Sequence, residues 1–136
     1  LKRKADFVIA YVDVDNFTDF NDKNGRSYGD RLLSEVAYAL RNRLGKSCVV
    51  GRIGSDEFVL LKRVKDLGDA SQLQALIRAT VADIHQIGNK PCQVSASVGT
   101  ALFSEVDNTQ QLLRKADRKM QMDKHGHSRL TKMFED

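Results

Sequence analysis

The sequence has no tryptophan, a single proline and only two cysteines among its 136 residues. Cys48 and Cys92 form neither a C-x-x-C pair nor a cysteine–histidine metal pattern, and this usage favours a reduced, cytoplasmic setting. The longest uninterrupted apolar run, Phe7 to Val12, is six residues long, whereas a membrane span needs about 20. We therefore expect no membrane contact by this segment, which would be a cytoplasmic domain if its parent protein were membrane-anchored.

The composition is that of an ordinary folded protein. Hydrophobic residues make up 41% and charged residues 29%, which excludes disordered, collagen-like and low-complexity chains. A chain of this length corresponds to one domain, expected over residues 1–136. Because the first residue is leucine and not methionine, we expect this domain to be a module of a longer, multidomain protein.

The excess of positive charge is concentrated near the end of the chain. Residues 114–132 contain seven basic and two acidic side chains, within a net charge of +4 for the whole sequence. A solvated helix face is the simpler interpretation, and an anion site is the functional alternative. A nucleic-acid-binding domain is the corresponding alternative for the whole chain, but no aromatic residue is interleaved with this stretch as a base-stacking surface would require. This alternative also leaves the carboxylates described below without a role, so we expect no nucleic acid as a partner.

Hydrophobic periodicity and turn residues predict the order of secondary structure. The expected elements are a buried strand from Phe7 to Val12, a helical turn and loop around Gly25, a helix from Tyr28 or Asp30 to Gly45, a hairpin of Cys48–Ile53 and Phe58–Leu61, a helix from Ser71 whose apolar stripe reaches Ile87, a strand from Val94 to Phe103 broken by Gly99, a helix from Asn108 or Thr109 to Gly126, and an edge strand from Leu130. This order predicts an α+β fold in which helices flank a mixed, largely antiparallel central sheet.

Three carboxylates stand where strands end. Asp13 ends the first strand, and Asp56 lies in the predicted hairpin turn beside Glu57. Two strand-end carboxylates together with substrate phosphate oxygens are a typical magnesium site, and the third could be a metal ligand or a general base. The alternative interpretation is that these residues only form turns and caps, as aspartate often does.

Four stretches, in order, carry a resemblance to a known family. They are Asp13-Val14-Asp15-Asn16-Phe17 with Asn21-Asp22, Gly25 and Gly29-Asp30; Arg52-Ile53-Gly54-Ser55-Asp56-Glu57-Phe58; Ser95-Ala96-Ser97-Val98-Gly99; and Ala116-Asp117 with Lys124 and Gly126. These stretches resemble the GGDEF family of diguanylate cyclases, with G-S-D-E-F in place of the signature, and they cover nearly the whole chain.

The resemblance implies a specific activity and site. Family members condense two GTP into cyclic di-GMP with release of pyrophosphate, depend on Mg²⁺ (or Mn²⁺), act as dimers, are often fused to sensor or output domains, and share a fold with nucleotide cyclases and the polymerase palm. Carried over by position, the implied residues are Asp13, the Val14 carbonyl and Asp56 for the metals, Asp56 and Glu57 for catalysis, Asn21 and Asp30 for guanine, and the Phe17 backbone, Lys124 and His127 for the phosphates.

The sequence also departs from the family pattern. Ser55 replaces the second signature glycine, Thr18 a usual lysine, and His127 a phosphate-binding arginine. Gly45 and Cys48 occupy the positions of the inhibitory R-x-x-D motif, so no inhibitory product site of that kind is expected. These departures keep open the alternative of a degenerate module that binds GTP or a partner domain and regulates an output domain without turnover. The intact acidic and guanine-reading positions favour the enzyme.

Overall fold

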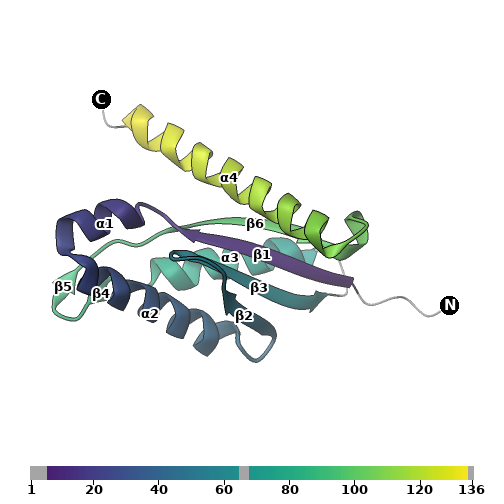
Figure 1. Ribbon diagram of the computed structural model, residues 1–136, viewed down its shortest axis with the longest axis horizontal. Helices are drawn as coiled ribbons and strands as arrows, with labels where there is room; N and C mark the ends of the chain where they lie inside the picture. Colours follow the sequence, from purple (N-terminus) through teal and green to yellow (C-terminus); the bar gives the residue numbers. More distant parts are fainter. Residues whose placement is uncertain (1–5, 65–67, 135–136) are drawn as a thin grey trace.

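The structure is a computed structural model that describes residues 6–64 and 68–134, with side chains described as far as residue 126. The elements are β1 (Asp6–Val14), α1 (Phe17–Asn24), α2 (Arg26–Leu44), β2 (Cys48–Arg52), β3 (Glu57–Val64), α3 (Gly68–Ala82), β4 (Gln86–Ile87), β5 (Lys90–Pro91), β6 (Ala96–Leu102), the 3₁₀ turn η1 (Phe103–Glu105) and α4 (Thr109–Phe134). Figure 1 shows α4 as a long helix that crosses the sheet.

In the described part of the chain, β1 lies inside a four-stranded sheet of order β2-β3-β1-β6. Each neighbouring pair in this sheet is antiparallel. The register places Asp13 opposite Glu57 on one side and opposite Ser97 on the other. The predicted α+β fold with a largely antiparallel sheet is confirmed, and the end of β1 becomes a meeting point for three strands.

Helices cover both faces of the sheet. The even-numbered residues of β1, Val8 to Val14, pack in one core with Val36 of α2 and Ile77 of α3. On the opposite face Ile9 packs with Ala116 of α4. This double burial explains why β1 is apolar almost throughout, as the sequence indicated.

The α4 face of the sheet is only partly covered. Helix α4 lies over β6 and β1 (Figure 1). On this face, apolar side chains of β2, of β3 and of the turn between them remain exposed to solvent. Val49 is 70% exposed and Ile53 is 52% exposed. They line an open apolar cavity of about 880 Å³ together with Phe7, Leu61 and Phe103.

Two expectations about helix ends are wrong. Helix α4 does not end at Gly126 but continues to Phe134, so the edge strand expected from Leu130 does not form. A glycine inside a helix costs only about 1 kcal/mol, which a helix already held against the sheet tolerates. Helix α3 ends at Ala82, and Ile87 instead enters the short hairpin of β4 and β5, where it is 1% exposed.

Other expectations differ in smaller ways. Gly99 does not break a strand, because β6 runs without interruption from Ala96 to Leu102. Helix α2 begins at Arg26 and α3 at Gly68, both earlier than predicted. Within the described residues, no helix is both long enough and apolar enough to cross a bilayer.

Candidate active site

The end of β1 and the hairpin turn between β2 and β3 form one side of the site. The Val14 amide donates a hydrogen bond to the Asp56 carbonyl at 3.1 Å, which holds the turn against β1. Glu57 begins β3 directly opposite Asp13. The structure therefore brings together the three carboxylates that the sequence singled out.

Asp13 is the buried member of this group, with only 4% of its surface exposed. Its Oδ2 accepts a hydrogen bond from Lys124 Nζ of α4 at 2.7 Å. Its Oδ1 is buried and has no hydrogen-bond partner among the described residues. A buried carboxylate with a free oxygen favours a further positive charge at this position.

The electrostatics of the cluster follow from this burial. Burial raises the pKa of Asp13 to about 6; the hydrogen bond from Lys124 opposes this rise and the nearby Asp56 carboxylate adds to it. The hydrogen bond to Asp13 in turn raises the pKa of Lys124 above its usual value. Lys124 therefore carries a full charge at neutral pH and acts as the counter-cation of Asp13.

The donor set fits a hard divalent cation. Asp13 and Asp56 could supply carboxylate oxygens, and Val14 could supply a backbone carbonyl beside them. Over the described ranges, no cluster of three or more His, Cys, Asp or Glu side chains is arranged for metal binding. Two carboxylates and one carbonyl would leave the remaining coordination positions of a magnesium ion to water and substrate phosphates.

Asp15 is oriented toward β6. Its carboxylate accepts hydrogen bonds from Ser95 Oγ at 2.6 Å and from Ser97 Oγ at 2.5 Å, and its amide bonds to the Ser95 carbonyl. These bonds fix the chain where it leaves β1 and enters α1. Asp15 therefore has a structural role in shaping the strand end that presents Asp13.

The predicted guanine-reading residues lie where α1 meets α2. Asn21 is in α1, and Gly29 and Asp30 are in the first turns of α2. A Cβ atom at Gly29 would lie 1.5 Å from Asn21 Oδ1, so only glycine allows this side chain to pack there. Asn21 Oδ1 is buried with no partner among the described residues, while Asp30 is exposed. An unpaired amide oxygen beside an exposed carboxylate offers two acceptors to a ligand.

The predicted phosphate-binding residues are only partly placed by the structure. Phe17 opens α1 immediately after the β1 strand end, with its ring packed in the core, so only its backbone faces outward. The first amides of a helix attract anions. Lys124 is paired with Asp13, and its side chain is 42% exposed. The side chain of His127 lies outside the residues that the structure describes.

The sequence analysis gave no individual role to two residues, Tyr11 and Arg52, that contribute to the site. Tyr11 was interpreted only as part of an apolar strand, but it lies on the same face of β1 as Asp13; burial, and then a hydrogen bond with Glu57, raises its pKa. Arg52 donates from Nε to the Gly54 carbonyl at 3.1 Å and from Nη2 to the Ser55 carbonyl at 2.5 Å. The two-residue alternation along β1 could have indicated Tyr11. No local pattern indicates that Arg52 secures the turn.

Comparison with known proteins agrees with this geometry. A family model described as "Diguanylate cyclase, GGDEF domain" matches residues 1–129. The chain therefore belongs to the GGDEF family.

Curated relatives and solved structures that resemble this chain are also diguanylate cyclases or GGDEF domains. The chain is 35% identical to the bifunctional diguanylate cyclase/cyclic di-GMP phosphodiesterase MucR of Pseudomonas aeruginosa, over 71% of this chain and 14% of MucR. It is 31% identical to the diguanylate cyclase DgcS of Shewanella oneidensis, over 86% of this chain and 38% of DgcS. The crystal structure of the GGDEF domain of PA1120 (YfiN or TpbB) from Pseudomonas aeruginosa matches with a TM-score of 0.84 at 30% identity, covering 90% of this chain and 78% of that one. The chain thus spans well under half the length of these two curated relatives.

Proposed function

We propose that this chain is the catalytic module of a diguanylate cyclase, which condenses two GTP into cyclic di-GMP and releases pyrophosphate. The observation that carries the proposal is the burial of Asp13 beside Asp56 and Glu57, with an Oδ1 that has no hydrogen-bond partner among the described residues. The module would act as a pair of facing copies, each presenting one GTP. Fusion to sensor or output domains fits the relatives, whose lengths greatly exceed that of the matched segment.

In this proposal Asp13, the Val14 carbonyl and Asp56 hold Mg²⁺ or Mn²⁺. When bound, the metal neutralises triphosphate charge and stabilises charge that develops at the reacting phosphorus. Lys124 is 42% exposed, so its ammonium group would also be available to the terminal phosphates of the substrate. The amides that follow Phe17, and His127, complete the phosphate contacts.

Glu57 accepts the proton of the ribose 3′-hydroxyl. The 3′-oxygen then forms a bond to the α-phosphorus of the facing GTP, and the bond from that phosphorus to pyrophosphate breaks. Two such transfers close the ring and release two pyrophosphates. Tyr11 lies on the same face of β1 as Asp13 and is close enough to Glu57 for this carboxylate to contribute to its raised pKa, so its hydroxyl is placed to orient Glu57 toward the reacting hydroxyl.

Asn21 and Asp30 select guanine. A carboxylate acceptor at Asp30 suits the N1–H and 2-amino donors of guanine, whereas adenine lacks both. The Asn21 amide offers a donor to the guanine 6-oxygen. A site that leaves buried polar groups unpaired with the wrong base discriminates strongly against it.

One observation favours a second candidate, a module that binds GTP but regulates an attached domain without turnover. Ser55 replaces the second glycine of the signature, and its Oγ donates to Asp56 Oδ1 at 3.3 Å. This contact engages an oxygen that the proposed metal site would use. GTP binding without product formation would identify this case.

The deciding experiment is incubation of the chain with GTP and Mg²⁺, followed by chromatographic detection of cyclic di-GMP and pyrophosphate. Asp56→Asn is the matched control, because it keeps the shape of the side chain and removes its charge. We expect product from the wild type and none from the variant. Absence of product with either Mg²⁺ or Mn²⁺, at concentrations where copies associate, would refute turnover.

A further inference from the structure

An ion pair joins α3 to α4 around the edge of the sheet. Arg78 Nη2 of α3 donates a hydrogen bond to Asp123 Oδ1 of α4 at 2.6 Å. The two helices pack on opposite faces of the sheet, α3 through Ile77 and α4 through Ala116 (Figure 1). Strand β6 forms the edge of the sheet between them. The reaction proposed above gives neither Arg78 nor Asp123 a role.

The Asp123 carboxylate also holds the backbone of β6. Its Oδ2 accepts a hydrogen bond from the Val98 amide at 2.9 Å. Gln74 Nε2 of α3 donates a hydrogen bond to the Val98 carbonyl, also at 2.9 Å. Val98 is fully buried, so its backbone groups need partners of this kind. The two oxygens of Asp123 therefore fix this turn of α4 in two directions, toward α3 and toward the edge strand.

The next residue of α4 is Lys124, which belongs to the proposed site. Successive residues of a helix point about 100° apart, so Asp123 can face the edge of β6 while Lys124 faces the end of β1. Lys124 Nζ lies 2.7 Å from Asp13 Oδ2. Val98 lies opposite Val12, the residue before Asp13, so the two contacts of α4 are close together on the sheet. A rotation or shift of this turn of α4 would draw Lys124 away from Asp13.

The positive charge of Arg78 compensates the Asp123 carboxylate. The Asp123 side chain is only 16% exposed, and a carboxylate removed from water needs a cation nearby. Without Arg78, we expect Asp123 to compete with Asp13 for Lys124, the cation that follows it in the chain. Arg78 thus favours the pairing of Lys124 with Asp13 in two ways, because it anchors the helix and it neutralises the competing carboxylate.

We propose that Arg78 and Asp123 are positioning residues that hold Lys124 against Asp13 and within reach of the terminal phosphates of the substrate. They act through the position of α4 and touch neither the substrate nor the metal. The role toward the phosphates rests on the proposed function. The placement of Lys124 on Asp13 does not, because this pair is present without a nucleotide.

The first test uses urea denaturation and needs no ligand. It measures how much unfolding free energy Lys124→Met removes in the wild type, in Arg78→Ala and in Arg43→Ala. Arg43 is a matched control, because it pairs with Asp83 at 3.0 Å and its side chain is 44% exposed, compared with 41% for Arg78. We expect the loss caused by Lys124→Met to fall by about half or more in Arg78→Ala, as for two coupled residues, and to stay unchanged in Arg43→Ala.

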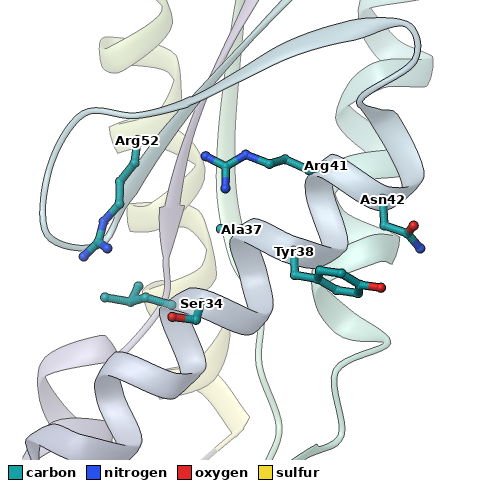
Figure 2. Close-up of a pocket in the computed structure, with 7 residues that line it drawn as sticks. Ser34, Ala37, Tyr38, Arg41, Asn42 and Arg52 are labelled. Atoms are coloured by element: carbon teal, nitrogen blue, oxygen red, sulfur yellow. The ribbon is translucent and has the colours of Figure 1, made fainter.

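Arg41→Ala is a second control, for the loss of one positive charge elsewhere. Figure 2 shows Arg41 extending from α2 into a pocket that Ala37 and Tyr38 also line. Helix α2 packs on the sheet face opposite α4, so we expect Lys124→Met to cost the same in Arg41→Ala as in the wild type.

Conservative variants separate positioning from a general loss of packing. Arg78→Lys keeps the positive charge and should restore most of the effect of Lys124→Met. If Arg78→Ala does not fold, Asp123→Asn takes its place, because it removes the charge and keeps an oxygen for the Val98 amide. Circular dichroism would verify the fold of each variant.

The second test measures binding of a non-hydrolysable GTP analogue and of GMP, both with Mg²⁺. GMP lacks the terminal phosphates that Lys124 would contact. We expect Arg78→Ala to weaken binding of the GTP analogue by about fivefold or more through loss of a charge-assisted contact, and binding of GMP by less than about twofold. In the Lys124→Met background, Arg78→Ala should have no further effect on the GTP analogue.

The outcomes separate this proposal from the proposed function. An equal cost of Lys124→Met in the wild type and in Arg78→Ala would overturn the proposal, even if the chain turns over GTP. An equal loss of GTP-analogue and GMP affinity in Arg78→Ala would assign Arg78 a general structural role and also overturn it. A wild type that binds no GTP analogue would refute the proposed function, and the denaturation test would still decide whether Arg78 and Asp123 place Lys124 on Asp13.

Discussion

Lys124 Nζ lies 2.7 Å from Asp13 Oδ2, which connects the last described helix to the end of the first strand. The two residues are 111 positions apart in the chain. The pair compensates a buried carboxylate, and it places the proposed phosphate-binding cation beside the proposed metal ligand. Helix α4 is thereby part of the proposed site and does more than cover the sheet.

Replacing Asp13 should abolish turnover without changing the fold. We expect Asp13→Asn to lose metal-dependent GTP turnover, because an amide is a poor substitute for an anionic ligand of Mg²⁺. The side chain keeps its shape, so far-UV circular dichroism should remain unchanged. Turnover equal to that of the wild type would rule out Asp13 as a metal ligand.

Nucleotide preference should depend on Asp30. We expect the wild type to bind GTP far more tightly than ATP, by several powers of ten if both guanine donors are paired. Asp30→Ala should reduce this ratio mainly by weakening GTP. Competition titrations with both nucleotides measure the ratio, and equal affinity of the wild type for ATP and GTP would contradict the proposed role of Asp30.

Gly99 should be essential for the packing of α4. A Cβ atom at this position would lie 2.2 Å from both the Ala116 carbonyl oxygen and the Met120 amide nitrogen. Because these are backbone atoms, Gly99→Ala must move the helix, and we expect a loss of about 2–3 kcal/mol in the free energy of unfolding.

Gly126 provides the control for this substitution. Among the described residues, no atom lies within 4 Å of where a Cβ would stand at this position, and the residue lies inside α4. We expect Gly126→Ala to add about 0.5–1 kcal/mol through helix propensity. Urea denaturation measures both variants. Equal stability of Gly99→Ala and the wild type would show that the helix does not approach β6 this closely.

A pH dependence is expected where η1 meets β1. Asp6 accepts hydrogen bonds from the Ser104 amide at 3.0 Å and the Ser104 hydroxyl at 2.5 Å. Partial burial acts to raise the pKa of Asp6, but the bonds from Ser104 and the Phe7 amide outweigh it and hold the pKa below its ordinary value. The charged Asp6 therefore stabilises the folded state above a pH of about 4, which is the ordinary pKa of aspartate in the unfolded chain. This stabilisation is lost as the pH falls through the lower pKa that Asp6 has in the folded protein.

The measurement compares the wild type with Ser104→Ala. We expect the variant to be less stable by a few tenths of a kcal/mol at pH 7, since the pair is solvent-exposed, and the difference to shrink toward pH 3. A difference that stays constant over this pH range would assign the effect to packing and not to the Asp6 charge.

Activity should depend on the association of two copies, because joining two GTP needs two facing half-sites. We expect the rate per molecule to rise with protein concentration. A dimerising coiled coil fused ahead of Leu1 should raise it further through effective concentration, provided that the linker allows the sites to meet. A rate per molecule that is constant on dilution and unaffected by the fusion would contradict this requirement.

The sequence by itself indicated the four strands of the central sheet, the main helices and the residues of the candidate site. The apolar run before Asp13 predicted a strand buried on both faces, and four motif stretches in order, from Asp13 to Gly126, carried the resemblance to the family. These are local features, because periodicity, turn residues and motif spacing depend on near neighbours in the chain.

Only the tertiary structure decided which of these residues meet. Ile87 fits a helical stripe equally well but reaches the core from a hairpin, because burial does not depend on which element supplies the side chain. The Asp13–Lys124 pair and the close contact of α4 with Gly99 join elements far apart in sequence. Such contacts are set by how helices pack on the sheet, and this packing leaves no periodic signal in the sequence.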